Sequence, residues 1–188
     1  MGVTVFFLPL GEKARLEPLE PWQAEEFAAN LDRAREHIRP WVGPAFVTDD
    51  VEGARATLRR YAERQAADDG RLFGIRLDGE LVGGVMFVEF DAARGSCEIG
   101  CWLEPAAEGH GLITRACEVL LDWAFTTRGL HRAEWQCRAD NARSAAVAER
   151  LGMVREGVLR EHWPYEGARY DKEIWSILAP DWKPRVTP

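Results

Sequence analysis

The stretch "EIGCWLEPAAEGHGLITRACEVLLDWAF", residues 98–125, decides the fold because it joins a strand pattern to a helix pattern through a glycine-containing turn. Its first residues alternate as a strand does, and from Ile113 onward apolar residues recur at helical spacing. Gly109 and Gly111 flank His110 where the helix begins. A helix start exposes unpaired N–H groups and a partial positive charge, and glycine lets a bulky anion approach. The stretch favours an anion-binding turn, although a plain glycine-rich turn explains the same residues.

Two better-known phosphate motifs do not fit this turn. A dinucleotide fingerprint requires a third glycine, but Leu112, Ile113 and Thr114 follow Gly111. The Gly-Lys-Ser/Thr of a nucleoside-triphosphatase loop is also absent from the sequence. The anion therefore has to be identified from the wider context.

Strand and helix patterns alternate along the rest of the chain without a linker or a fixed repeat, which indicates one domain, residues 1–188. The pattern predicts the order β-α-α-β-β-β-α-β-α-β-β, with Thr48 or Asp49 capping the second helix and Asp78-Gly79 forming a hairpin turn. We expect strands at 14–19, 71–77, 80–90, 95–104, 131–140, 153–163 and 168–178, and helices at 21–36, 47–67, 113–128 and 141–152. The antiparallel meander precedes a strand-helix-strand crossover, so the fold class is α/β with a mixed sheet.

Composition and charge argue against several classes of protein. The formal net charge of −7 argues against a nucleic-acid partner. No stretch reads as a signal peptide or a membrane span, which indicates a cytoplasmic protein. The four cysteines lie in apolar surroundings without a CxxC pair, so we expect small buried side chains, with no metal site and no disulfide.

Residues 98–125, together with "CRADNARSAAVAERLGMVREGVLRE" at 137–161, resemble the GCN5-related N-acetyltransferases, the GNAT family. Within that family they are most similar to the RimJ/RimL-like ribosomal-protein N-acetyltransferases. The resemblance covers nearly the whole chain. It implies the GNAT acyl-CoA N-acyltransferase fold, with a splayed parallel strand pair after the meander, and acetyl-CoA as cosubstrate without a metal.

The resemblance also assigns the coenzyme A site. In the family pattern Gln/Arg-x-x-Gly-x-Gly/Ala, backbone amides hold the pyrophosphate; Gly109 and Gly111 match, and Ala106 departs from the first position. The implied loop consists of Glu108, Gly109, His110, Gly111, Leu112, Ile113 and Thr114. The backbone of Trp102 and Leu103 corresponds to the bulged strand that pairs with the pantetheine arm. Asn141 corresponds to a pantetheine contact that also caps a helix, and Ser144 to a residue facing the thiol.

Acetyl transfer needs a neutral amine, a held oxyanion and a proton for the departing thiolate. Glu98 is the expected general base, because alternation places it opposite Cys97 and Ile99 and relatives carry a glutamate there. A solvent-facing carboxylate is the alternative. Glu161 and Glu166 are rival bases, and Ser144 is the expected general acid. We expect structural or exposed roles for His110 and His162.

Six of the eight tryptophans form two groups. Trp22, Trp123, Trp135 and Trp175 sit in apolar patterns and are expected in the core. Trp41 and Trp163 are expected in loops beside proline, where with Glu166 they would line an acceptor groove, surface packing or a subunit interface being the alternatives.

The leading interpretation is an acetyl-CoA-dependent N-acetyltransferase, an enzyme whose acceptor is the N-terminal α-amine of a protein; the resemblance implies a ribosomal protein. A small amine such as an antibiotic or polyamine is one alternative, and a non-catalytic coenzyme-A-binding sensor is another. The family resemblance and the aromatic stretch 163–178 favour a homodimer.

Overall fold

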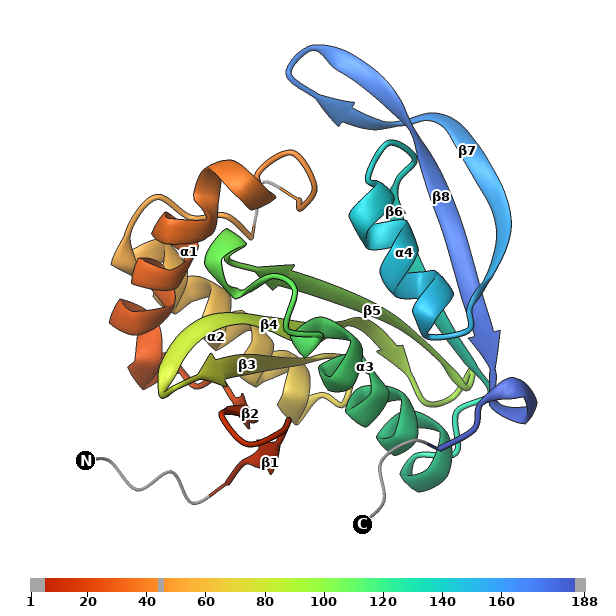
Figure 1. Cartoon of the computed structure of the whole chain (residues 1–188), viewed down its shortest axis with the longest axis horizontal. Helices are drawn as coiled ribbons and strands as arrows, with labels where there is room; N and C mark the ends of the chain where they lie inside the picture. The colour runs from red at the N-terminus through yellow and green to blue at the C-terminus, as the bar shows by residue number, and fades with distance from the viewer. Residues whose placement is uncertain (1–5, 44–45, 185–188) are drawn as a thin grey trace. The chain divides into compact units, whose positions relative to one another are not determined.

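The computed structural model describes residues 6–43 and 46–184 (Figure 1). Its helices are α1 (Ala24–Ile38), α2 (Val51–Ala66), α3 (Leu112–Asp122) and α4 (Ala142–Arg150). Its strands are β1 (Leu8–Pro9), β2 (Ala14–Pro18), β3 (Arg71–Leu77), β4 (Glu80–Asp91), β5 (Ser96–Leu103), β6 (Arg132–Arg138), β7 (Val154–Tyr165) and β8 (Ala168–Leu178). The predicted order is confirmed, with the two-residue strand β1 added before it.

The strands follow the order β1-β2-β3-β4-β5-β6-β8-β7 in one mixed sheet. β5 and β6 pair in parallel from Ser96 opposite Arg132 to Ile99 opposite Trp135, as the predicted crossover requires. β8 pairs antiparallel with both β6 and β7. At the β3–β4 turn, Asp78 and Gly79 have φ of 50° and 93°, the left-handed pair that a two-residue hairpin needs.

The described residues form two compact units. The first contains 6–43, 46–86 and 101–116, and the second contains 87–100 and 117–184. The expected single domain stays a prediction. None of the helices within 6–43 and 46–184 is long and apolar enough to span a membrane.

In the first unit, α2 packs against α1 and β3. The apolar faces of these elements bury Phe27, Leu31, Leu58 and Ile75 completely, which supplies the main stabilisation of the unit. α2 is capped by Asp50, whose carboxylate accepts from the Gly53 N–H at 2.7 Å. The expected cap at Thr48 or Asp49 was wrong by one or two residues, because Asp50 has the extended backbone that an N-cap requires.

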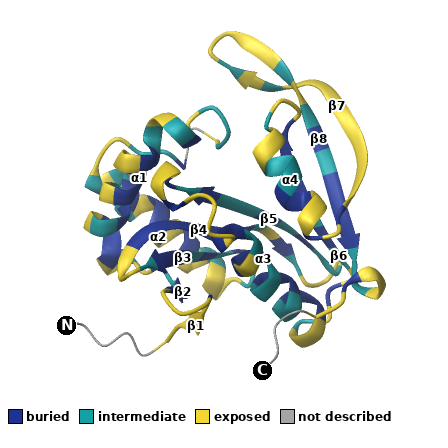
Figure 2. Ribbon diagram, viewed as in Figure 1, coloured by how far each residue is buried: buried dark blue, intermediate teal, exposed yellow. Residues whose placement is uncertain are grey.

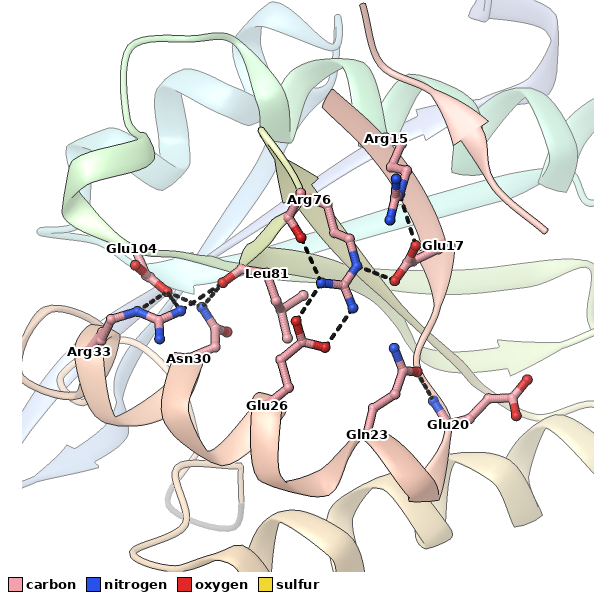
Figure 3. Close-up of polar contacts among 11 residues, drawn as sticks. Arg15, Glu17, Glu20, Gln23, Glu26, Asn30, Arg33, Arg76, Leu81 and Glu104 are labelled. Carbon is pink, nitrogen blue, oxygen red and sulfur yellow. Dashed lines mark hydrogen bonds and ion pairs between the residues drawn. The ribbon is translucent and has the colours of Figure 1, made fainter. Parts of the chain in front are cut away.

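The first unit also buries a charged group between α1 and the sheet (Figure 3). The Arg76 guanidinium donates to Glu17 and, at 2.5 and 2.6 Å, to both oxygens of Glu26. These hydrogen bonds raise the pKa of Arg76 above its ordinary value. Arg76 and Glu17 are both less than 9% exposed, and each has a second charged partner, Glu26 for Arg76 and Arg15 for Glu17. The buried charges are therefore compensated by a network and not by one pair.

In the second unit, β8 lies between β6 and β7. β7 is exposed along almost its whole length, whereas the second half of β8 is mostly buried (Figure 2). The residues of β7 and of the β7–β8 turn therefore contribute few side chains to the hydrophobic core.

Four tryptophans were expected in the hydrophobic core, and their burial in the structure can be compared with that prediction. Trp135 and Trp175 are buried as predicted, and Trp123 is half-buried against Phe87 and Phe90. Trp22 contradicts the prediction, since it is 75% exposed and donates to Glu20. It follows Pro21 in the first helical turn and lies on the outward side of α1's start.

Candidate active site

The predicted pyrophosphate loop lies in the first unit. After β5, Glu104 begins a short 3₁₀ turn, Pro105–Ala107, and α3 begins at Leu112. Gly109 and Gly111, both exposed, have φ of 82° and 67°, a conformation that costs other residues about 1–2 kcal/mol. The glycines therefore turn the chain into α3, whose first N–H groups have no carbonyl partner four residues back in the helix.

Two polar contacts fix this loop, and the sequence patterns identified neither. Nε2 of His37, on α1, lies 2.6 Å from Oε1 of Glu108. The Arg115 guanidinium donates to the carbonyls of His110 and Leu10, both at 2.7 Å. His37 and Glu108 are far apart in the chain, and Arg115 bonds to backbone carbonyls, which every residue type carries. No local sequence motif therefore predicts these contacts.

The end of β5 packs tightly against the core of the first unit. Trp102 is 2% exposed and donates its indole N–H to Oδ1 of Asn30 at 2.8 Å. A Cβ on Gly83 would lie 2.4 Å from the Trp102 carbonyl oxygen, and one on Gly84 would lie 2.2 Å from the Trp102 ring. The two glycines of β4 are thus required for β5 to approach, while Leu103 beside Trp102 stays half-buried.

Glu98, the expected base, lies on β5 in the second unit. Its neighbours Cys97 and Ile99 are buried while Glu98 is half-buried, in agreement with the predicted alternation. Burial raises the pKa of Glu98 to about 7, with Glu89 and Glu134 adding to the rise and Lys172 opposing it. Near neutral pH this carboxyl can both accept and release a proton, as a general base must.

Ser144 and Asn141 lie at the start of α4, also in the second unit. The Asn141 side chain accepts from the Ser144 N–H at 3.1 Å, so Asn141 caps the helix. Oγ of Ser144 accepts from the indole N–H of Trp135 at 2.9 Å. Burial raises the pKa of the Cys137 thiol to about 11, against which a hydrogen bond from Ser144 acts. The Ser144 hydroxyl is therefore oriented by one buried donor.

The residues expected at an acceptor groove are placed on separate elements. Trp41 lies in the turn after α1 and donates its backbone N–H to Ile38. Trp163 lies in β7 opposite Tyr170 on β8. This agrees with the predicted strand 153–163, of which Trp163 is the last residue, and contradicts the loop position expected from the adjacent proline. The Trp163–Pro164 pair stays in a strand because β7 is an edge strand, where proline is tolerated.

The rival carboxylates lie along the exposed hairpin of β7 and β8. Glu166 forms its turn with φ of 48°, and Glu161 has φ of 52° at an irregularity between Leu159 and Trp163. Both carboxylates are exposed, as are His110 and His162, which agrees with the ordinary roles expected for these histidines. Neither of these two carboxylates is held in a half-buried position as Glu98 is, so Glu98 is the stronger candidate.

The sequence matches the description "Acetyltransferase (GNAT) domain" over residues 13–154. The chain belongs to the GNAT family of acetyltransferases. The resemblance drawn from residues 98–125 and 137–161 is confirmed, and this GNAT protein is an N-acetyltransferase. The roles of individual residues in its site stay predictions.

Among GNAT relatives, the chain is 30% identical over 180 residues to YdaF of Bacillus subtilis, whose name proposes a ribosomal N-acetyltransferase; 95% of this chain and 98% of YdaF are covered. The ribosomal-protein-S5-alanine acetyltransferase from Vibrio fischeri superposes with a TM-score of 0.83 at 25% identity, covering 95% of this chain and 100% of that one. RimJ from Mycobacterium smegmatis, in complex with a CoA-disulfide, superposes with a TM-score of 0.81 at 27% identity, covering 89% and 82%.

Proposed function

We propose that this GNAT enzyme transfers the acetyl group of acetyl-CoA to the N-terminal α-amine of a protein, with a ribosomal protein as the acceptor. The observation that carries this proposal is the half-buried Glu98, whose pKa is raised to about 7. A protein α-amine has a pKa of about 8, whereas that of lysine is about 10.4. A carboxylate of this basicity can take a proton from an α-amine at neutral pH, and a lysine would demand more.

Acetyl-CoA would be held by backbone groups. In this proposal the loop Glu108–Thr114 binds the pyrophosphate through the N–H groups at the start of α3, and the positive φ of Gly109 and Gly111 lets the anion approach. The backbone of Trp102 and Leu103 pairs with the pantetheine arm. Asn141 contributes a further pantetheine contact. Acetyl-CoA supplies the activated acyl group, and the chain supplies orientation.

The proposed chemistry is direct transfer. The amine nitrogen attacks the thioester carbonyl while its proton passes to Glu98, and the new C–N bond replaces the C–S bond. The thiolate takes a proton from the Ser144 hydroxyl, which regains one from water as Glu98 releases the amine proton to solvent. The hydrogen bond from Trp135 to Ser144 supports this role, since it fixes the serine oxygen as an acceptor and leaves its hydrogen to donate.

The acceptor site is proposed to include Trp41, Trp163 and Glu166. The relatives named as ribosomal-protein acetyltransferases support a protein N-terminus as acceptor. A homodimer in the cytoplasm is part of the same proposal, and the exposed Val158 and Leu159 on the edge strand β7 fit a subunit contact.

A polyamine is the second candidate acceptor. Glu89 and Glu134 both raise the pKa of Glu98 by their charge, so three carboxylates gather near this position. Together with the net charge of −7, they would attract a polycation.

The test is calorimetric titration of the purified protein with acetyl-CoA, followed by thiol release with peptides that carry ribosomal-protein N-terminal sequences, Nα-blocked lysine peptides, and spermidine. Binding with turnover on free N-termini alone would support the proposal. Turnover confined to spermidine would replace it with the second candidate. Binding without any turnover would indicate a sensor, and absence of binding would refute the assignment of acetyl-CoA.

A further inference from the structure

Helix α1 directs a row of polar side chains at the segment that leads into the proposed pyrophosphate loop. Asn30, Arg33 and His37 are spaced by three and four residues and so lie on one face of the helix. Asn30 and Arg33 contact Glu104, and His37 contacts Glu108. One helical face therefore supports the whole passage from the end of β5 to the loop.

Asn30 is the centre of this row, and its side chain is completely buried; Figure 3 shows it beside Arg33, pointing toward Glu104 and Leu81. Its Oδ1 accepts from the Trp102 indole N–H at 2.8 Å, and its Nδ2 donates to Oε1 of Glu104 at 2.5 Å and to the Leu81 carbonyl at 3.2 Å. An indole N–H only donates and a carboxylate only accepts, so the amide has a single orientation here. Neither aspartate nor leucine could satisfy both partners.

Glu104 transmits this position to the loop. Its backbone N–H donates to the Val82 carbonyl at 2.8 Å, and its own carbonyl accepts from Ala107 at 3.1 Å to close the 3₁₀ turn. Pro105 follows and restricts Glu104 to its extended backbone. The turn delivers the chain to Glu108, four residues after Glu104.

Stability alone does not require an amide at this point. Trp102 already packs edge-on against Phe27 and Phe46, with ring centroids 5.8 and 5.0 Å apart. Replacing a buried hydrogen-bonded pair by apolar groups of similar shape can be nearly neutral for stability. A polar group in such a place fixes one arrangement of the backbone.

We propose that Asn30 is a positioning residue for acetyl-CoA: by holding Trp102 and Glu104, it fixes the strand end and the turn that present the cofactor-binding backbone. This inference rests on the proposed function, in which Trp102, Leu103 and the loop Glu108–Thr114 bind acetyl-CoA. Asn30 acts through these residues and not on the substrate itself.

The test compares Asn30→Leu with Gln23→Met. Gln23 is also a buried polar residue at α1, but it bonds only its own helix start, where its side chain accepts from the Glu20 N–H at 2.8 Å. We expect Asn30→Leu to raise both the acetyl-CoA dissociation constant and the KM for acetyl-CoA about tenfold. kcat and the KM for the acceptor should change by less than about threefold, and Gln23→Met should lose thermal stability without weakening acetyl-CoA binding.

Acetyl-CoA binding by the wild-type protein distinguishes failure of the proposed function from failure of the positioning role of Asn30. If wild-type protein does not bind acetyl-CoA, the proposed function fails and this inference fails with it. If wild-type binds and folded Asn30→Leu binds equally well, or Gln23→Met weakens binding as much, only the positioning role is overturned. Should Asn30→Leu not fold, Trp102→Phe removes one hydrogen bond of the same network and keeps an aromatic ring; a threefold or larger loss of affinity supports the inference, and an unchanged affinity overturns it.

Discussion

The indole N–H of Trp135 donates a hydrogen bond of 2.9 Å to Oγ of Ser144. Trp135 is only 2% exposed, so its indole N–H has a fixed position from which to donate. The serine oxygen is therefore oriented before any substrate arrives, and its hydrogen is left to donate. In the proposed reaction this hydrogen passes to the departing thiolate.

We predict that Ser144→Ala lowers kcat by about 100-fold, the range typical of a lost general acid, with little change in acetyl-CoA affinity. Trp135→Phe should lower kcat about fivefold, because the hydroxyl loses its orienting donor. Steady-state thiol release and calorimetry measure the two effects. Ser176→Ala, which removes another buried hydroxyl of the same unit, is the control; unchanged kcat in Ser144→Ala would exclude the general-acid role.

The rate of acetyl transfer should depend on pH through the ionisation of Glu98. Because burial raises the pKa of Glu98 to about 7, kcat/KM for the acceptor should rise through neutral pH as the carboxyl ionises. Glu98→Gln should lower the rate about 100-fold and remove that rise, leaving only the rise at about pH 8, where the acceptor α-amine itself loses its proton. Glu134→Gln should keep activity and move the rise to lower pH, since the Glu134 charge contributes to the raised pKa of Glu98. A profile that Glu134→Gln leaves unmoved would assign the titration to another group.

Glu98 should also make stability depend on pH. Its pKa is raised from an ordinary 4.5 to about 7, so the folded state binds the proton more tightly than the unfolded state. The folded state loses stability as pH rises from about 4.5 through 7, by about 2–3 kcal/mol. Glu98→Gln should therefore stabilise the protein at pH 8 and have little effect at pH 4.5, as measured by urea unfolding. Equal effects at both pH values would contradict the raised pKa.

Gly111, in the proposed pyrophosphate loop, and Gly129, outside it, provide a matched pair of positions for substitution. Gly111 and Gly129 share a φ of 67°, so valine at either position meets similar backbone strain, but only Gly111 belongs to the proposed pyrophosphate loop. Gly111→Val should raise the acetyl-CoA dissociation constant at least tenfold, about 1.4 kcal/mol, whereas Gly129→Val should lose stability alone. Calorimetry on both folded variants decides. Equal affinities would refute the amide loop.

Asn141 is predicted to have two roles that can be separated. Aspartate also caps helices, so Asn141→Asp should keep the bond from the Ser144 N–H and keep thermal stability. It loses the amide donor and adds a negative charge, and acetyl-CoA affinity should fall several-fold. Asn141→Ala should also cost about 1 kcal/mol of stability. If Asn141→Asp binds as tightly as wild type, Asn141 is a cap and nothing more.

The fold was predictable because its elements carry local signals. Alternation along residues 96–103, the Asp78-Gly79 turn and the cap at Asn141 each depend on neighbours in sequence. The placement of Trp163 was wrong because its adjacent proline was taken as a sign of a loop, while the edge position of β7 tolerates it.

The site was predictable only in part. Alternation indicated which face of β5 carries Glu98, but its pKa depends on Glu89, Glu134 and Lys172 on other strands. The bond from Trp102 to Asn30 spans 72 residues, and no spacing in one sequence announces such a contact. Positions on a strand or at a helix start could be predicted from neighbours in sequence, whereas contacts and pKa shifts set by tertiary neighbours could not.

The exposure of the β7–β8 hairpin has a consequence for divergence among related enzymes. Substitutions at exposed positions usually change stability by less than about 0.5 kcal/mol, so most of β7 can drift without threatening the fold. Gly83 and Gly84, against Trp102, have no such latitude. Related chains can therefore diverge in the sequence of β7 while the packing of the β5 end on β4 stays unchanged.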